Sequence, residues 1–367
     1  MQRFRKNSVV TLLTALAFLA AGCGSNGSGS SASPSGSPSA APASSAPAAS
    51  PSAQASAAAK SSHEGLTVTL GIQPGPGPYS LARKKGWFEE EYAKVGVKVE
   101  WAEFQSGPPM TEAIAANRLD FAGLGNLPVV TAQAADIGFT EISQIIDGKT
   151  NVAIIVPKGS KITKIEELKG KKVAVAKGSN AFNFLYLGLD KAGLKPTDLE
   201  IIQLQPNEAQ PAFETGGVDA WATWDPYITT NVISGKGTVL TDGQTLGVLS
   251  PSFLIARTKL AQEHPDLVTA FLKVYEQARV WEGTHLEEAN KLYAEQFQVN
   301  AAVIQELRKR AQPINLPISK EVIEQQQKTA DFQFDQKTIR KKIDVSKVVD
   351  NTFIEQAIKD AAKEPKS

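Results

Sequence analysis

Hydrophobic and polar positions change their spacing repeatedly after Gly65, between the two-residue period of strands and the longer period of helices. The spacing predicts strands at 66–70, 97–104, 119–122, 151–156, 171–176, 199–204, 218–223 and 252–256. It predicts helices at 79–95 with an interruption at Gly86, 106–117, 180–193, 208–215, 265–281, 286–297, 301–310 and 320–334, and a helix that begins at Asn126. Alternating strands and helices indicate an α/β protein with largely parallel sheets.

The first 22 residues have the pattern of a secretory signal peptide. Arg3, Arg5 and Lys6 precede an uncharged run over residues 9–22, which is too short to span a bilayer. The run ends in small residues before Cys23, the only cysteine of the chain. This arrangement resembles the lipobox of bacterial lipoproteins, in which the cysteine thiol is acylated. We therefore expect a signal peptide at 1–22 and a lipid, such as palmitate, on Cys23.

The segment after Cys23 consists almost entirely of Gly, Ser, Ala and Pro up to Ser62. Such a composition cannot bury enough apolar surface to offset its ordering entropy, so residues 23–63 are expected to form a disordered linker. The protein would then be a folded body tethered to the outer face of the cytoplasmic membrane.

Composition argues against several other classes of function. The chain is 42% hydrophobic and 21% charged with a net charge of +1, so it lacks the basic surface of nucleic-acid-binding proteins. His63, His264 and His285 have neither metal-ligand nor catalytic-triad spacing. No Walker loop or nucleophile elbow is present. We therefore expect no catalytic residue, no metal and no cofactor.

Four predicted strand-to-helix turns share small and neutral polar residues. They are 105–108, 123–126, 177–180 and 224–226. In open α/β sheets, ligands bind outside the carboxyl ends of the strands, and helix N-termini there favour an anion. For any one turn taken alone, helix capping is the favoured explanation, whereas the four turns together favour a binding site. Gln73, which follows the first predicted strand, is expected to contribute as well. The expected ligand contacts are Gln73, Ser106, Gly107, Asn126, Ser179, Asn180, Trp224 and Asp225.

Trp224 and Asp225 each allow two interpretations. An aromatic residue at a strand end is more often part of a core, but Trp224 lies at the turn itself and is expected to form a wall of the site. Asp225 precedes Pro226 and could be a helix N-cap. It could equally orient a donor or pair with an amine on a ligand.

The region from Leu66 to Asp344 resembles the aliphatic-sulfonate-binding proteins of ABC importers, within the wider nitrate, sulfonate and taurine group. The matching stretches are 99–104, 106–108, 175–179, 217–227, 263–266 and 341–345. The resemblance implies a type II periplasmic-binding-protein fold with two lobes joined by two crossing strands, near 153–157 and 250–256. Lobe 1 would comprise 64–157 and 250–367, and lobe 2 would comprise 158–249.

The resemblance also implies a function and partners. The protein would be the extracytoplasmic solute-binding subunit of an importer, a monomer that delivers a small anionic alkanesulfonate to a permease and its ATPase. Three departures from the family pattern leave the ligand open: 72–74 is Ile-Gln-Pro, 125–126 is Gly-Asn, and Phe182 replaces a usual histidine. Taurine, nitrate or a pyrimidine thiamine precursor are alternative ligands. An enzyme that makes such a precursor is a further alternative, disfavoured because it uses a cysteine-rich segment and iron.

Overall fold

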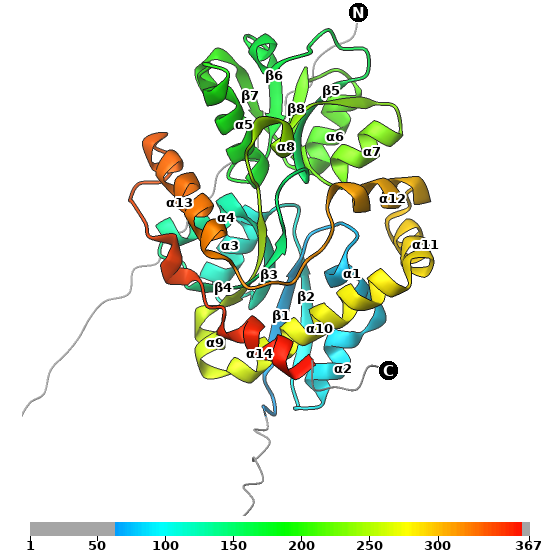
Figure 1. The fold of residues 1–367 in the computed structure, drawn as a ribbon, viewed down its shortest axis with the longest axis vertical. Helices are drawn as coiled ribbons and strands as arrows, with labels where there is room; N and C mark the ends of the chain where they lie inside the picture. The colour runs from blue at the N-terminus through cyan, green and yellow to red at the C-terminus, as the bar shows by residue number, and fades with distance from the viewer. Residues whose placement is uncertain (1–62, 362–367) are drawn as a thin grey trace, which may run out of the picture. The chain divides into compact units, whose positions relative to one another are not determined.

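The computed structural model describes residues 63–361. The expectations for the signal peptide, Cys23 and most of the linker therefore lie outside the described residues. These residues form one compact unit with two five-stranded sheets, and Figure 1 shows these sheets with their surrounding helices.

The first sheet combines parallel and antiparallel pairing. Its order is β2-β1-β3-β10-β4. β1 (Thr67–Ile72), β2 (Lys98–Glu103) and β3 (Phe121–Gly125) are parallel, whereas β10 (Ser252–Arg257) is antiparallel to both β3 and β4 (Phe139–Ile146). The core beside it is rich in aromatic residues, and Phe121 stacks on Phe271 with ring centroids 4.2 Å apart.

The second sheet repeats the same arrangement, with the order β7-β6-β8-β5-β9. β6 (Lys172–Val175) pairs in parallel with β7 (Glu200–Gln203) and β8 (Ala220–Trp224). β5 (Val152–Pro157) is antiparallel to β8 and β9 (Gly237–Asp242). Four strands of each sheet thus run in the same direction, as expected for largely parallel sheets, and one strand, β10 or β5, runs antiparallel to its two neighbours.

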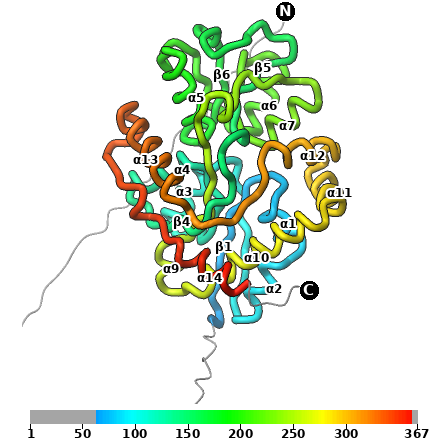
Figure 2. The backbone as a smooth tube through the Cα atoms, viewed as in Figure 1, coloured from blue at the N-terminus to red at the C-terminus, as the bar shows by residue number. Residues whose placement is uncertain are grey.

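The chain passes between the sheets twice, at 147–151 and at 247–251, and Figure 2 traces both passages. The two passages touch, because the Ser250 N–H donates to the Gly148 carbonyl at 2.8 Å. A Cβ atom on Gly148 would lie 2.4 Å from the Pro251 nitrogen, so only glycine fits this approach. By strand pairing, β5 belongs to the second sheet, although the sequence analysis placed 153–157 in lobe 1.

The helices cover the faces and ends of the two sheets (Figure 1). The helices that alternate with the strands of the first sheet, or that follow its last strand in the sequence, are α1 (Pro78–Lys85), α2 (Trp87–Ala93), α3 (Gly107–Ala115), α4 (Asn126–Ala134), α9 (Thr258–Glu263), α10 (Pro265–Thr284), α11 (Leu286–Phe297), α12 (Ala301–Arg310), α13 (Lys320–Asp335) and α14 (Thr352–Ala361). Those of the second sheet are α5 (Asn180–Lys191), α6 (Pro206–Glu214), α7 (Tyr227–Ile233) and α8 (Gly243–Leu246).

Two helices that follow the first sheet in the sequence also contact helices of the second sheet. α12 contacts α7 of the second sheet, and Gln333 of α13 donates to the Asn183 side chain of α5 at 2.7 Å. The C-terminal helices therefore cover part of the junction between the sheets, in addition to packing on the first sheet.

The pattern located most elements, and the interruption expected at Gly86 separates α1 from α2 with φ +74°. It missed β4, β9, α8, α9 and α14. β4 escaped because its buried positions include polar Glu141, Ser143 and Gln144, which bond to later parts of the chain.

Candidate functional site

A cavity of about 240 Å³ is lined by residues of both sheets and of the C-terminal helices. Six of the eight expected contacts line it: Gln73, Gly107, Ser179, Asn180, Trp224 and Asp225. Ser106 and Asn126 do not line it, although each adjoins a lining glycine in sequence. The rest of the wall is largely apolar, with Ile72, Leu124, Ile145, Ile146, Ile304 and Leu307.

Three of the four turns meet closely. A Cβ on Gly125 would lie 2.8 Å from the Asn180 Cβ, so the turn after β3 lies against the first residue of α5. A Cβ on Gly107 would lie 2.6 Å from Pro128 Cγ. Glycine at these positions lets the starts of α3, α4 and α5 approach one another, and a helix start carries N–H groups without intrahelical partners.

The start of α5 is capped by its own side chains. The Ser179 hydroxyl accepts from the Phe182 N–H at 3.2 Å and donates to the Ala176 carbonyl at 2.7 Å. The Asn180 side chain accepts from the Ala181 N–H at 3.0 Å. The Ser179 side chain is thus engaged in capping, and any ligand contact there would fall to the main chain and the Asn180 amide.

Ser106 and Asn126 carry buried polar atoms without hydrogen-bond partners in the described residues. Ser106 is 0% exposed and Asn126 is 1% exposed. The Ser106 hydroxyl and both polar atoms of the Asn126 side chain lack a partner. A buried polar group without a partner costs about 1–3 kcal/mol, so these atoms favour a nearby hydrogen-bonding ligand.

Gln73 and the loop that follows it form another side of the cavity. The Gln73 amide donates to the Gly123 carbonyl at 3.1 Å, which ties β1 to β3 at their carboxyl ends. Gly75 lies next to Pro226, because a Cβ there would be 3.5 Å from the proline Cδ. The fourth turn thus faces the 73–78 loop.

Asp225 combines capping with an ion pair. One carboxylate oxygen accepts from the Thr229 N–H at 2.9 Å and from its hydroxyl at 2.6 Å. The other accepts from Arg310 Nε at 3.0 Å, and the two side chains are 5% and 17% exposed. Burial raises the pKa of the Asp225 carboxyl, and the Arg310 guanidinium opposes that shift. The capping interpretation therefore has direct support, and pairing with a ligand amine stays a prediction.

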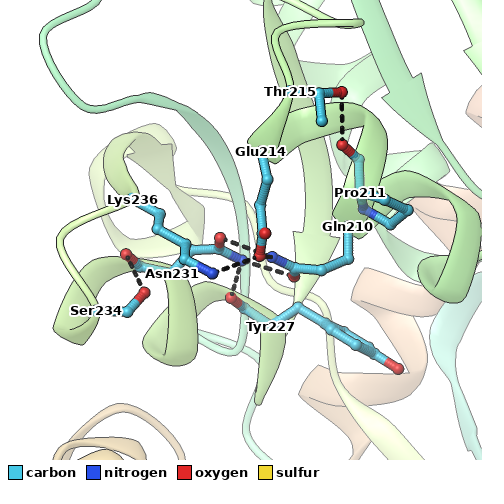
Figure 3. Close-up of polar contacts among 8 residues, drawn as sticks. All are labelled: Gln210, Pro211, Glu214, Thr215, Tyr227, Asn231, Ser234 and Lys236. Atoms are coloured by element: carbon cyan, nitrogen blue, oxygen red, sulfur yellow. Dashed lines mark hydrogen bonds and ion pairs between the residues drawn. The ribbon is translucent and has the colours of Figure 1, made fainter.

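A polar network joins α7 to α6, as Figure 3 shows. Gln210 and Asn231 exchange hydrogen bonds of 2.9 and 3.0 Å between their amides. Asn231 also donates to the Tyr227 carbonyl at 2.8 Å, and it is 0% exposed. Glu214 extends the network by accepting from Gln210 at 2.6 Å and from Lys236 at 2.8 Å. The network therefore fixes α7, which directly follows the 224–226 turn, to α6.

The sequence analysis missed the wall that α10, α11 and α12 contribute. Glu282, Tyr293 and Arg308 line the cavity from these three helices. A signal for Glu282 was available, because it continues the buried stripe of Phe271, Tyr275 and Ala278 at helical spacing. Tyr293 and Arg308 offered no comparable local signal.

Residues 63–361 contain no group of three or more His, Cys, Asp or Glu side chains that could hold a metal ion. Within the same residues, no helix has both the length and the apolar character needed to cross a membrane.

Comparisons with known proteins agree on one family. The model of the family described as NMT1/THI5 like matches residues 73–289. The chain is 43% identical over 350 residues to the putative aliphatic sulfonates-binding protein of Bacillus subtilis, covering 95% of this chain and 96% of the relative.

Two solved structures share the fold. The alkanesulfonate-binding protein SsuA from Xanthomonas axonopodis pv. citri, bound to MOPS, superposes with a TM-score of 0.74 at 30% identity, covering 79% of this chain and 99% of that one. The periplasmic aliphatic sulphonate binding protein SsuA from Escherichia coli gives 0.68 at 32% identity, covering 77% and 97%. The chain therefore belongs to the NMT1/THI5-like family, alongside proteins named for aliphatic sulfonate binding, and has their type II periplasmic-binding-protein fold.

Proposed function

We propose that this protein is the extracytoplasmic solute-binding subunit of an ABC importer and that it captures aliphatic sulfonates. One observation carries the ligand class: the cavity joins the starts of α3, α4 and α5 to a largely apolar wall. Helix starts favour an anionic headgroup, and the apolar wall favours an alkyl tail. Nitrate and sulfate have no alkyl tail for the apolar wall, and neutral sugars have no anionic group for the helix starts.

The proposed contacts are the six lining residues of the expected set, together with Ser106 and Asn126 as donors or acceptors close behind them. The ligand would favour a closed arrangement of the two lobes, and motion would occur at the passages 147–151 and 247–251. The closed form would then dock on a permease that is served by an ATPase.

Calorimetric titration of the purified protein tests the ligand class. We expect heat and saturable binding with short alkanesulfonates and much weaker binding with nitrate, sulfate and glucose. Taurine and a hydroxymethylpyrimidine belong in the same panel, because the family pattern leaves them as alternatives. Tight binding of a pyrimidine without binding of any sulfonate would overturn the proposal.

We further propose that Cys23 carries the lipid that holds the protein at the outer face of the cytoplasmic membrane. Two acyl chains on one residue give stable anchoring, whereas one gives marginal binding. The wild type should fractionate with membranes and yield an acylated N-terminal peptide by mass spectrometry. The Cys23→Ser variant should lose the membrane association. An unmodified Cys23 in the membrane fraction would contradict the anchor.

The protein is proposed to have no enzymatic role. The cysteine-rich segment of the pyrimidine-precursor synthases has no counterpart here, since Cys23 is the only cysteine. Ligand recovered unchanged after prolonged incubation with the protein would support a binding role, and its conversion would contradict it.

A further inference from the structure

Glu282, Tyr293 and Arg308 form a cluster in the cavity wall, which we call the helical cluster. Glu282 comes from α10, Tyr293 from α11 and Arg308 from α12, and all three line the cavity. Glu282 and Tyr293 are 3% and 1% exposed, and the Arg308 side chain is 17% exposed. None of the three belongs to the four turns that are proposed to hold the anion.

Part of the hydrogen-bonding capacity of the helical cluster is used internally. Arg308 Nη1 lies 2.8 Å from a carboxylate oxygen of Glu282. Arg308 Nε donates to the Asn290 side chain at 2.8 Å, and the guanidinium carbon lies 6.0 Å from the centre of the Tyr293 ring. These contacts fix the orientation of the guanidinium group.

The remaining capacity is open. Across the described chain, Glu282 Oε2, the Tyr293 hydroxyl and Arg308 Nη2 are buried without a hydrogen-bond partner. Burial raises the pKa of the Glu282 carboxyl, and the Tyr293 hydroxyl opposes this shift through at most a weak hydrogen bond outside standard geometry. The cluster therefore holds, in residues that line the cavity, one acceptor, one pure donor and one hydroxyl that can do either.

The charges of the helical cluster limit what it can bind. A ligand carboxylate would meet Arg308 favourably but would lie against the Glu282 carboxylate. A ligand ammonium would meet Glu282 favourably but would lie against the guanidinium, and it has no lone pair for Arg308 Nη2. An uncharged group that both donates and accepts satisfies all three atoms without a like-charge contact, and a hydroxyl is the smallest such group.

We propose that the helical cluster is a second subsite, which binds a hydroxyl group on the tail of the sulfonate. The preferred ligands are then hydroxyalkanesulfonates, with the sulfonate at the four turns and the hydroxyl at Glu282, Tyr293 and Arg308. This inference rests on the proposed function, because it assigns the tail of the same ligand.

The test compares matched ligands by calorimetry on the purified protein. Unsubstituted alkanesulfonates of two to five carbons are titrated beside their ω-hydroxy counterparts. We expect the hydroxyl to tighten binding about tenfold at the chain length that spans the cavity, as one or two net hydrogen bonds would do. At that length, the ω-amino and ω-carboxy counterparts should bind more weakly than the hydroxy compound.

Two variants assign the preference to the helical cluster. Tyr293→Phe keeps the ring and removes the hydroxyl, so the preference for the hydroxy compound should fall to about twofold or less. Glu282→Gln leaves the Arg308 charge without its counterion, so affinity for the ω-carboxy compound should rise relative to the wild type. Tyr186→Phe is the matched control, because Tyr186 stacks on Phe182 and does not line the cavity, and it should keep the wild-type preference.

The outcomes separate this inference from the proposed function. If alkanesulfonates bind and no hydroxy compound binds more tightly than its parent, the subsite is wrong and the function stands. An unchanged hydroxyl preference in Tyr293→Phe would also overturn the subsite. If no sulfonate of either kind binds, the proposed function fails and the subsite fails with it.

Discussion

Arg310 and Asp225 join the last residue of α12 to the turn after β8 through an ion pair of 3.0 Å. Arg310 also donates to the Thr150 carbonyl in the first passage between the sheets. The pair therefore links the C-terminal helices to the second sheet beside the cavity.

Asp225→Asn should destabilise the protein by about 3 kcal/mol, because it leaves the Arg310 guanidinium buried without its counterion. Urea unfolding measures this change. The double variant Asp225→Asn with Arg310→Met should recover part of the loss. The control is Glu103→Gln, which breaks the exposed pair with Arg83 and should cost at most about 1 kcal/mol. Equal costs for the two single variants would contradict the importance of burial.

Gly125→Ala should weaken alkanesulfonate binding at least about tenfold. The new methyl group would lie 2.8 Å from Asn180 Cβ and would push the start of α5 away from the turn after β3. Gly123→Ala is the matched control in the same cavity, because its methyl group would be 3.6 Å from its nearest neighbour, Ile145. Calorimetry compares the two. Similar affinities would show that close contact of the turns is not needed for binding.

Stability should fall with rising pH because of Glu141. This carboxyl is 2% exposed and accepts from the Gln326 amide at 3.0 Å. Burial raises its pKa from 4.5 to about 8, and Gln326 opposes the shift. Between these values the folded state keeps a proton that the unfolded chain loses, so unfolding becomes easier by up to about 1.4 kcal/mol per pH unit.

Glu141→Gln should remove this dependence, and the exposed Glu112→Gln should not. Urea midpoints measured from pH 4 to pH 9 give the comparison. The difference between Glu141→Gln and the wild type should grow with pH and then level off above the folded-state pKa. A constant difference across the range would contradict a buried, protonated Glu141.

Asn231→Ala should cost about 2–3 kcal/mol, because it removes a fully buried amide and leaves the Gln210 side-chain oxygen without the donor at Asn231 (Figure 3). Ser234→Ala is the control at the end of the same helix, where the hydroxyl makes one bond of 3.3 Å to the Asn231 carbonyl. Its cost should stay below about 0.5 kcal/mol. Thermal unfolding followed by circular dichroism measures both, and a similar loss in each would contradict the role of the network.

The local pattern was sufficient where structure depends on neighbours in sequence. Ser106, Asn126 and Asn180 stand at helix starts that the spacing predicted. The convergence of the starts was inferred from the general placement of sites at strand ends. In the structure, the close approach of Gly125 to Asn180 shows that two of these helix starts meet.

Long-range partners decided the features that were missed. Glu141 and Gln144 lie in a buried strand because Gln326 and Leu316 satisfy them from much later in the chain. Arg308 resembles any exposed arginine near a helix end, and only the fold brings it to Glu282. Such residues lack a local signature, since their burial depends on a charge or amide that the sequence places elsewhere.

The cavity wall is encoded in widely separated stretches of the gene. A chimera that exchanges residues 152–246 with those of a relative would transplant Asn180, Trp224 and Asp225 but retain Glu282, Tyr293 and Arg308 from the recipient. In the chimera, Arg310 of the recipient would also face the relative's residue at the position of Asp225. Engineering of ligand preference in this scaffold therefore calls for co-transfer of the helices from residue 265 to residue 310.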